Sequence, residues 1–473
     1  MNNIAKHFNW FILLVLVLHI VLKLAFISQE TLYTDEPYSL SIAQQSFQEI
    51  YAQSLQDSNP PLYLFLLHIW VTLFGVSAMA AKLFSVLASV ATGLMIALFA
   101  KKFCNIPTAI FASILYLGSN VQLYYSHEIR TYAVLGFFIM LSMYVFFSLL
   151  RSPNKRFLIL LALINVALLL FHYTSIYVHI AQGIIALLHF RTHTKAFWYY
   201  CISQIISCIL FFPWILTVFQ NAPSNAGWIK SPNWGDFVNI LIVLSNSKAA
   251  VVVFALLCLG VLYVAIQKPH MLNSSWNIKQ FLSLAIWFIV PLVLNYIISQ
   301  FSPQFLIRTL LFTNLGLCIL VGYAFSVLKV GKYIQYTVAG VVGISYLYSF
   351  SVYQPRPEQW NKVVPPLTQK SESTAVFVSP WYTYRAFAYY YNIDYFKNHT
   401  RTLELLSAEH VHFLDNPQTL DSIQIVQFDT IHIITCRGPM EQFDSVLTSF
   451  RYKQLHHSQY WDMKNAIYVR SHQ

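Results

Sequence analysis

Apolar residues gather in long blocks along this chain, and this pattern limits the possible folds more than any other feature. Several blocks run for roughly 18 to 25 residues, the length that a helix needs to cross about 30 Å of hydrocarbon. Only 10% of the residues are charged, against about 25% in soluble globular proteins. The sequence therefore predicts a polytopic α-helical membrane protein and excludes a soluble enzyme, a disordered chain and a coiled coil. Twelve apolar runs lie at residues 8–28, 61–76, 78–100, 107–124, 131–150, 157–171, 176–190, 196–220, 249–267, 281–298, 309–329 and 335–352.

The net charge of +11 is unevenly distributed. Residues 1–352 contain 18 Lys and Arg but 7 Asp and Glu, whereas residues 353–473 contain 11 of each. The excess of positive charge thus lies in the membrane part, where basic cytoplasmic loops set the orientation. Binding to nucleic acid would instead require a basic face on a soluble domain, so the sequence predicts no nucleic-acid partner.

The basic loops also predict which apolar runs cross the membrane. If the N-terminus is cytoplasmic and every run crosses, the pair Lys101–Lys102 is placed outside, against the positive-inside rule. Treating 61–76 as a juxtamembrane helix of the first outer loop removes the conflict and leaves about 11 transmembrane helices, although 12 stays open. The C-terminal residues are then extracytoplasmic, and the location is the cytoplasmic (inner) membrane. The loops taken as cytoplasmic hold Lys101–Lys102, Arg151/Lys155/Arg156, Arg191/Lys195, Lys268/Lys279 and Lys329/Lys332.

The last 121 residues have a different pattern. Short β-branched runs predict buried strands, and two segments between and after them predict helices. We therefore expect a small extracytoplasmic α/β domain at 353–473, after a transmembrane domain at 1–352 whose outer loop spans 29–77. The predicted strands are 374–379, 430–435 and 466–470, and the predicted helices are 385–392 and 440–450.

The first outer loop is strongly acidic. No Lys or Arg occurs between Lys23 and Lys82, yet five acids lie within residues 30–57. Asp35 begins a predicted helix that runs to about Ser54, and a second helix follows Asp57. Helix capping explains an acid ahead of a first-turn proline, and this interpretation stays open. Acids beside a bilayer are costly, however, and usually have a function.

Six segments in order resemble a known family. They are "YTDEPYSLS", "DSNPPLYLFLLHIW", "AAKLFSVLAS", "HEIRTYAV", "HYTS" and "SPQFLIRTLLF". Together they resemble the GT-C class of integral-membrane glycosyltransferases, specifically the protein O-mannosyltransferase-like (PMT-type) group. Lipid A aminoarabinose transferases and lipopolysaccharide galacturonosyltransferases are related to that group. The resemblance covers about residues 8–352, and the tail resembles the variable domain of such enzymes only weakly.

The resemblance implies roles for individual residues. The catalytic carboxylate of the family corresponds to Asp35, with Glu36 beside it. The second acidic element corresponds to Glu128. Basic residues that meet the lipid phosphate correspond to Lys82, where relatives more often have Arg, and to Arg308, where "RTLLF" replaces the more usual Arg-Tyr-Leu.

The chemistry of such an enzyme explains these residue types. No nucleotide sugars are available outside the membrane, so a polyprenyl phosphate sugar is the natural donor. Its phosphate leaves as a stable anion and needs positive charge, for which Lys82, Arg130 and Arg308 are candidates. The acceptor hydroxyl needs a general base, and Asp35 at a helix N-terminus would stay ionised. Direct attack would invert the anomeric configuration.

Other candidates have structural alternatives. Arg130 follows Glu128 by two residues, and a cap at a helix end explains it equally well. His172 lies in a short outer turn, where a lone histidine is more often structural than functional. Asp57 in the acidic loop is a candidate substrate ligand, with capping as its alternative. We expect these three residues, with Lys82, Glu128 and Arg308, to bind the donor phosphate or sugar.

The sequence thus predicts a hexosyl- or pentosyltransferase that uses a polyprenyl-phosphate sugar and a lipid, glycan or protein acceptor among membrane lipids. No cofactor is predicted, although a divalent metal stays open. Two alternatives come from other classes: a transporter or flippase of lipid-linked glycans, and a non-enzymatic membrane scaffold. Transporters usually place charges near the midplane of repeated halves, which this sequence does not show. The donor sugar, acceptor, oligomeric state and role of the tail are not encoded in the motifs.

Overall fold

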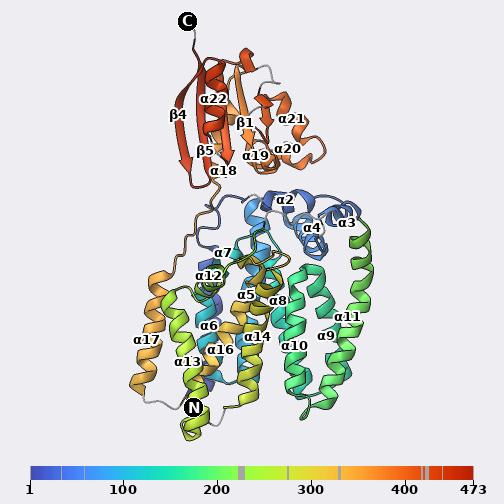
Figure 1. Ribbon diagram of the computed structural model, residues 1–473, viewed down its shortest axis with the longest axis vertical. Coiled ribbons are helices and arrows are strands. Elements are labelled where there is room, and N and C mark those ends of the chain that lie inside the picture. Colours follow the sequence, from blue (N-terminus) through green and yellow to red (C-terminus); the bar gives the residue numbers. More distant parts are fainter. Residues whose placement is uncertain are drawn as a thin grey trace. The chain divides into compact units, whose positions relative to one another are not determined.

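The computed structural model of this chain is mostly helical and contains a single described sheet (Figure 1). It describes residues 2–33, 35–57, 59–221, 229–273, 276–328, 332–416, 419–420, 425–438 and 440–471. The chain divides into two compact units, which are considered separately here. The first contains Met1–Ile27, Phe47–Trp70 and Met79–Tyr353, and the second contains Ser28–Ser46, Val71–Ala78 and Gln354–Gln473. The predicted division at residue 352 stays a prediction, because contacts alone do not show which segments fold independently.

The first unit is a bundle of long helices that run side by side (Figure 1). Most of the described residues in the twelve apolar runs predicted from the sequence are helical in the structure. The helices are α1 (Asn2–Leu24), α3 (Phe47–Gln56), α4 (Leu62–Phe74, whose last turn belongs to the second unit), α5 (Ala78–Phe103), α6 (Ile106–Leu117), α7 (Asn120–Ser126), α8 (Tyr132–Arg151), α9 (Lys155–Phe171), α10 (Ile176–Leu188), α11 (Thr194–Asn221), α12 (Trp234–Leu244), α13 (Lys248–Gln267), α14 (Ile278–Ile298), α15 (Ile307–Leu310), α16 (Thr313–Val327) and α17 (Lys332–Ser349).

Six described helices are long and apolar enough to cross a membrane: parts of α1, α5, α8, α11, α13 and α14. The pair α6 and α7 adds a seventh if it forms one span. Helix α4 has 13 residues, fewer than the roughly 20 that a crossing needs. The count of about 11 crossing helices stays a prediction, since length and composition alone select fewer.

The apolar run 107–124 is not the single helix that we expected. It bends by 61° between α6 and α7. A bend inside a membrane leaves backbone groups that need new partners. Asn246 supplies them: its Nδ2 donates to the carbonyl oxygen of Gly118 (2.6 Å), and its Oδ1 accepts from the backbone N–H of Asn120 (3.1 Å). The bend is therefore stabilised by a residue far along the chain.

Close packing joins α6 and α16. A Cβ added at Gly322 would lie 3.0 Å from the carbonyl oxygen of Thr108 and 3.1 Å from the backbone nitrogen of Ala112. Small residues allow such approaches between membrane helices, where hydrogen bonds also hold helices together. Here the hydroxyls of Thr108 and Ser326 lie 2.8 Å apart. Glycine at position 322 thus permits the contact.

A buried polar triad joins α8, α9 and α10. The Ser142 hydroxyl donates to Asn165 Oδ1 (2.6 Å), Asn165 Nδ2 donates to Gln182 Oε1 (2.9 Å), and Gln182 Nε2 donates to the Ser142 oxygen (2.8 Å). All three side chains are buried. Each donor therefore finds an acceptor away from water, which fixes these helices relative to one another.

The second unit contains the short helix α2 (Asp35–Ile42) and the tail. The strands β1 and β3 coincide with two predicted strands, and β5 includes the third. Helices α19 and α22 confirm the two predicted helices. The strands are β1 (Thr374–Ser379), β2 (Val411–Phe413), β3 (Thr430–Cys436), β4 (Tyr452–Tyr460) and β5 (Met463–Arg470), and the helices are α18 (Trp360–Val363), α19 (Tyr384–Tyr391), α20 (Ile393–Lys397), α21 (Thr402–Ala408) and α22 (Glu441–Ser449).

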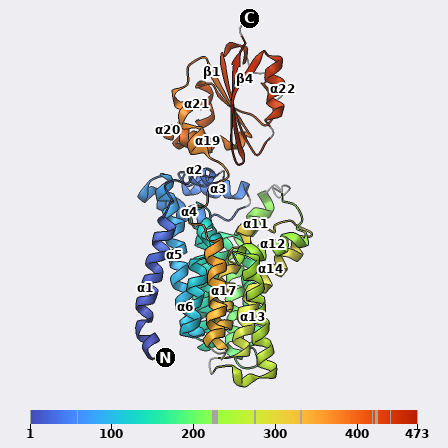
Figure 2. The same ribbon diagram turned by 90° about the vertical axis from the view of Figure 1, so that its left-hand side faces the viewer.

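The five strands form one sheet in the order β2-β1-β3-β5-β4. Strand β1 pairs in parallel with β2 and β3, while β5 is antiparallel to β3 and β4. Val376 is opposite Val411 on one side and His432 on the other. Helix α22 covers one face of the sheet, and α20 and α21 lie on the other (Figure 2). The tail is therefore a three-layer α/β unit, in agreement with the predicted class.

The acidic segment differs from its prediction. A single helix was expected from Asp35 to about Ser54, but α2 ends at Ile42 and α3 begins at Phe47. No Gly or Pro interrupts residues 43–46, so a break in the helix could not be predicted there. Within the turn, the N–H groups of Gln44 and Gln45 donate to the carbonyls of Ser41 and Ile42. Residues 35–74 thus contain three short helices, α2, α3 and α4, where two were predicted.

Candidate active site

The turn between α7 and α8 carries Glu128 and Arg130. Two neighbouring helices hold this turn in the first unit. The Ser85 hydroxyl of α5 donates to the carbonyl oxygen of Glu128 (2.5 Å), and His127 Nε2 donates to the carbonyl oxygen of Lys23 in α1 (2.6 Å). Glu128 is buried and Arg130 is half-buried. Their backbone is therefore fixed by side chains from distant parts of the sequence.

Lys82 lies on the same face of α5 as Ser85, because residues three apart are neighbours on a helix surface. Its side chain is fully buried. Burying an ammonium group costs several kcal/mol unless opposite charge or hydrogen bonds compensate it. Lys82 is thus a buried cation on the face of α5 that supports the Glu128 turn.

The turn after α9 contributes His172, and it is joined to the segment that carries Arg308. The backbone N–H of Thr174 donates to His172 Nδ1 (3.2 Å), so this nitrogen is an acceptor and the ring proton is on Nε2. The Thr174 hydroxyl donates to the carbonyl oxygen of Thr309 (3.2 Å), the residue after Arg308 in α15. These contacts place His172 next to α15.

Charged and polar side chains of these turns lie close enough to interact electrostatically. Burial lowers the pKa of His172, and together with the smaller effects of the positive charges of Arg130 and Arg308 it brings this pKa from 6.5 to about 4. The Tyr125 hydroxyl interacts with the charges of Glu128 and Arg308. Glu128, Arg130, His172 and Arg308 therefore lie close to one another in the first unit, and Lys82 lies on the face of α5 that contacts the Glu128 turn. This cationic cluster consists of Lys82, Glu128, Arg130, His172 and Arg308.

The lowered pKa predicts how His172 behaves with pH. Because the imidazole is neutral above about pH 4, His172→Gln should leave the shape of the pH–rate profile unchanged between about pH 5 and 8. Below that range, protonation would add a third positive charge beside Arg130 and Arg308, so the wild type should lose rate on the acid side. Sugar-transfer rates of both proteins from pH 4 to 8 test this. A step near pH 6.5 that disappears in the variant would contradict it.

Asp35 and Glu36 belong to the second unit. The carboxylate of Glu36 accepts a hydrogen bond from the backbone N–H of Tyr33 (2.6 Å), and Glu36 is fully buried. A carboxylate that reaches back three residues is typical of a helix start, so the structure gives Glu36 a role in fixing α2. The catalytic role of Glu36 stays a prediction.

Asp35 is half-buried at the start of α2. Its carbonyl oxygen accepts from the Ser39 hydroxyl (3.1 Å), as in the first turn of a helix. Asp35 also interacts electrostatically with the hydroxyl of Tyr382 in the tail, as do Arg437 and Glu358. Within this unit, the predicted base therefore has tail residues as neighbours.

Asp57 lies just after α3, in the first unit. Gln53 Nε2 donates to Asp57 Oδ1 (3.3 Å), and the backbone N–H of Asp57 donates to the carbonyl oxygen of Gln53 (3.0 Å). These contacts describe the C-terminal end of α3 rather than the cap of the next helix. A role of Asp57 in substrate binding stays a prediction.

A pocket of about 470 Å³ is lined in part by the segment that precedes Arg308. Phe305, Leu306 and Ile307, which directly precede Arg308, form one wall, and Lys230 and Asp236 belong to the other. A mixed apolar and polar lining is typical of ligand sites. This pocket could not be predicted from the sequence because its walls are about 70 residues apart in the chain.

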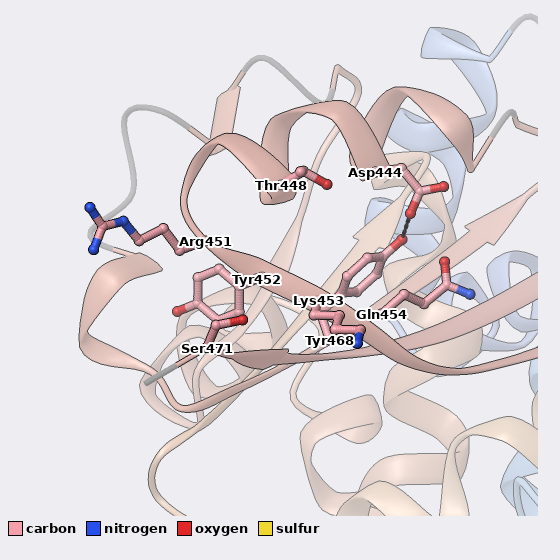
Figure 3. Close-up of a pocket in the computed structure, with 8 residues that line it drawn as sticks. All are labelled: Asp444, Thr448, Arg451, Tyr452, Lys453, Gln454, Tyr468 and Ser471. Carbon is pink, nitrogen blue, oxygen red and sulfur yellow. Dashed lines mark hydrogen bonds between the residues drawn. The ribbon is translucent and has the colours of Figure 1, made fainter. Parts of the chain in front are cut away.

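A second pocket, of about 570 Å³, lies in the tail (Figure 3). None of its lining residues belongs to the predicted site. Its one carboxylate, on Asp444, is hydrogen-bonded to the Tyr468 hydroxyl. The lining residues are Asp444, Thr448, Arg451, Tyr452, Lys453, Gln454, Tyr468 and Ser471.

Sequence reasoning missed the residues that support the cluster. Ser85, Tyr125 and Thr174 are common types at membrane interfaces and helix ends, and they carry no motif of their own. Only Ser85 had a detectable signal, because its spacing of three residues from Lys82 predicts that both lie on one face of a helix. In the described part of the chain, no group of three or more His, Cys, Asp or Glu side chains is arranged to hold a metal ion.

Comparison with known families gives one match. Residues 58–216 match the model of a family described as dolichyl-phosphate-mannose-protein mannosyltransferase. This range contains four residues of the cationic cluster, while Arg308 lies beyond it. A sequence comparison with curated proteins gave no match.

Several solved structures resemble the whole chain. ArnT from Cupriavidus metallidurans bound to undecaprenyl phosphate matches with a TM-score of 0.59 at 11% identity, over 97% of this chain and 98% of ArnT. The Archaeoglobus fulgidus oligosaccharyltransferase tethered to an acceptor peptide matches with 0.55 at 10% identity, over 100% of this chain and 75% of that chain. The oligosaccharyltransferase AglB from the same organism, in complex with an inhibitory peptide and a dolichol-phosphate, matches with 0.53 at 9% identity, over 98% and 74%. The chain is thus a multi-pass membrane protein with the GT-C fold, and it is mannosyltransferase-like over residues 58–216.

Proposed function

We propose that this protein is a glycosyltransferase that moves a sugar from a polyprenyl-phosphate carrier to a hydroxyl acceptor. The observation that carries the proposal is the cationic cluster, in which the positive charges of Arg130 and Arg308 both lower the pKa of His172. The cluster holds three cations, Lys82, Arg130 and Arg308, and one carboxylate, so its net positive charge favours an anionic ligand. A lipid-linked phosphate is an anion that reaches such a site through the bilayer.

The cluster matches what the leaving group requires. As the bond between sugar and phosphate breaks, negative charge grows on the phosphate oxygens. Guanidinium and ammonium groups held ready in a water-poor site stabilise that charge without rearranging. Arginine can also bind a phosphate through two parallel hydrogen bonds. Lys82, Arg130 and Arg308 would therefore bind the donor phosphate, with Glu128 helping to orient the two arginines or the sugar.

The neutral state of His172 also fits this role. With Nδ1 occupied by the Thr174 N–H, the ring presents Nε2–H as a donor. A neutral donor can bind a sugar hydroxyl or a phosphate oxygen without adding to the repulsion between two guanidinium groups. We assign His172 to substrate binding rather than to proton transfer.

Asp35 is the proposed general base. Its carboxylate would take the proton of the acceptor hydroxyl while the oxygen attacks the anomeric carbon and polyprenyl phosphate leaves. A single displacement inverts the anomeric configuration, which the anomeric coupling constant of the product would report.

The similar structures support a lipid-linked donor in general terms, since their ligands include undecaprenyl phosphate and dolichol-phosphate. We place the reaction on the outer face of the cytoplasmic membrane, with the N-terminus inside and the tail outside, from the distribution of basic loops. A hexose or a pentose, and a lipid, glycan or protein acceptor, all remain compatible with the cluster.

Cells that lack the protein test the function. We expect one class of surface glycan, glycolipid or glycoprotein to lose a single sugar residue, which mass spectrometry detects as a fixed mass difference. Wild-type protein should restore that sugar. If all surface glycans are unchanged while lipid-linked sugars redistribute across the membrane, a transporter becomes the better explanation.

A further inference from the structure

The tail makes direct contacts with the segment that precedes Asp35. The hydroxyl of Tyr390, on α19, accepts a hydrogen bond from the backbone N–H of Leu32 (2.7 Å) and another from the Thr31 hydroxyl (3.3 Å). Leu32 and Thr31 are buried. The backbone three residues before Asp35 is therefore fixed by a tail side chain.

A buried ion pair makes a second connection. Arg356 Nε lies 3.4 Å from Glu30 Oε2, and the side chains are 0% and 2% exposed. Removing one partner of such a pair leaves an uncompensated buried charge, which costs more than the loss of a surface salt bridge. The pair thus joins the start of the tail to residue 30 of the acidic segment.

Arg437 makes a third connection. It donates to the Tyr33 hydroxyl, and its guanidinium lies 5.2 Å from the centre of the Tyr33 ring. Its position is fixed from the tail, because it donates to Glu358 Oε1 (3.1 Å) and lies 3.8 Å from Asp462 Oδ2. Beyond Asp35, the guanidinium of Arg385 lies 4.9 Å from the ring of Tyr38. Tail residues therefore contact the chain both before and after Asp35 in the sequence.

From these contacts we propose that the tail positions the catalytic helix α2. Tyr390, Arg356 and Arg437 are positioning residues: they act on the reaction by fixing residues 30–33 and hence the direction of the Asp35 carboxylate. This proposal rests on the proposed role of Asp35 as the base. It gives the tail a part in catalysis that does not depend on acceptor binding, and small errors in the placement of a base have large effects on rate.

Tyr390→Phe tests the proposal with little risk to folding, because it removes one oxygen atom. We expect backbone amides in residues 28–38 to exchange hydrogen about tenfold faster, since the Leu32 amide loses its acceptor. We expect kcat to fall about tenfold with the KM for donor unchanged. The matched control is Tyr395→Phe, whose hydroxyl bonds Glu409 Oε1 inside the tail (3.2 Å) and should change neither quantity.

The charged pair provides an independent test. Arg356→Met should lower kcat, and Arg356→Lys, which keeps a positive charge near Glu30, should recover part of the loss. Rates are measured as release of polyprenyl phosphate from a lipid extract of cells that lack the protein, at increasing amounts of extract. If Arg356 only filled space, Arg356→Lys would recover no more activity than Arg356→Met, and that result would contradict the proposed role of the charge.

Two results would overturn the proposal. One is unchanged hydrogen exchange at 28–38 in Tyr390→Phe, and the other is faster exchange with wild-type kcat. Failure of the proposed function is distinguishable, because hydrogen exchange requires no donor or acceptor. If exchange rises as expected but Asp35→Asn is fully active, the tail fixes the segment and Asp35 is not the base.

Discussion

Asp35→Asn is expected to lower the rate of sugar transfer by about 10³-fold, within the range of roughly 10² to 10⁴ attributed to general bases. Asparagine has nearly the same shape as aspartate and also suits a helix start, so α2 should still form. Its amide cannot accept the proton of an attacking hydroxyl. The loss should therefore fall on kcat, with membrane abundance and donor binding close to those of the wild type.

Asp394→Asn is the matched control for this substitution. Asp394 is an exposed acid in the first turn of α20, and its Oδ1 lies 3.4 Å from Lys397 Nζ. A surface ion pair of this kind contributes little to stability, so activity should stay within about twofold of wild type. If Asp35→Asn behaves like Asp394→Asn, the carboxylate of Asp35 is only a helix cap.

Arg308→Gln is expected to lower kcat/KM for the donor by about 10² to 10³-fold, the cost of removing one preorganised group that stabilises transition-state charge. Glutamine keeps a hydrogen-bond donor but not the charge. Arg308→Lys should recover only part of the loss, because lysine does not reproduce the bidentate geometry of a guanidinium. The exposed Arg401, paired with Glu404 in the tail, provides the control Arg401→Gln, which should be silent.

A spectroscopic consequence accompanies the kinetic one. Arg308 contributes to the lowered pKa of His172, so its removal should raise that pKa toward the ordinary value of 6.5. Histidine ring NMR of the wild type and Arg308→Gln measures the shift without any substrate. An unchanged pKa together with unchanged kinetics would place Arg308 outside the donor site.

Coupling between the two arginines can be measured directly. If Arg130 and Arg308 bind the same phosphate, the effects of Arg130→Gln and Arg308→Gln should not add, since residues in one network show interaction energies of about 0.5–3 kcal/mol in double-mutant cycles. Additive effects would indicate separate sites.

The helices were largely predictable from the sequence. Long apolar blocks satisfy their backbone groups in a bilayer as helices, and most of the described residues in these blocks are helical. The bend between α6 and α7 was not predictable, because Asn246, more than 120 residues away, satisfies the freed backbone groups. The break after Ile42 likewise lacks a Gly or Pro and depends on the surroundings.

The tail shows the same contrast. Strands β1 and β3 were predicted because both are buried runs of β-branched residues. Strand β4, with the sequence YKQLHHSQY, was missed since it is mostly exposed at the edge of the sheet. Polar edge strands avoid unwanted pairing and so lack the apolar alternation by which strands are recognised.

Five candidate site residues were proposed from the resemblance and Asp57, Arg130 and His172 from their own chemistry and position, whereas the contacts around them came from the structure. The contact between Thr174 and Thr309 joins segments 135 residues apart, and no local pattern encodes it. The contacts of Tyr390 and Arg356 with residues 30–32 are still more distant in sequence. Tertiary contacts of this kind decide which charges act together.

The most direct test of the central claim is the release of polyprenyl phosphate by the purified protein. The substrate is a lipid extract from cells that lack the protein, in which the unused donor should accumulate. Mass spectrometry should show that wild-type protein, given the matching acceptor extract, consumes one polyprenyl-phosphate sugar and forms polyprenyl phosphate in equal amount, while Asp35→Asn does not. No consumption of any lipid-linked sugar, or equal consumption by Asp35→Asn, would contradict the account.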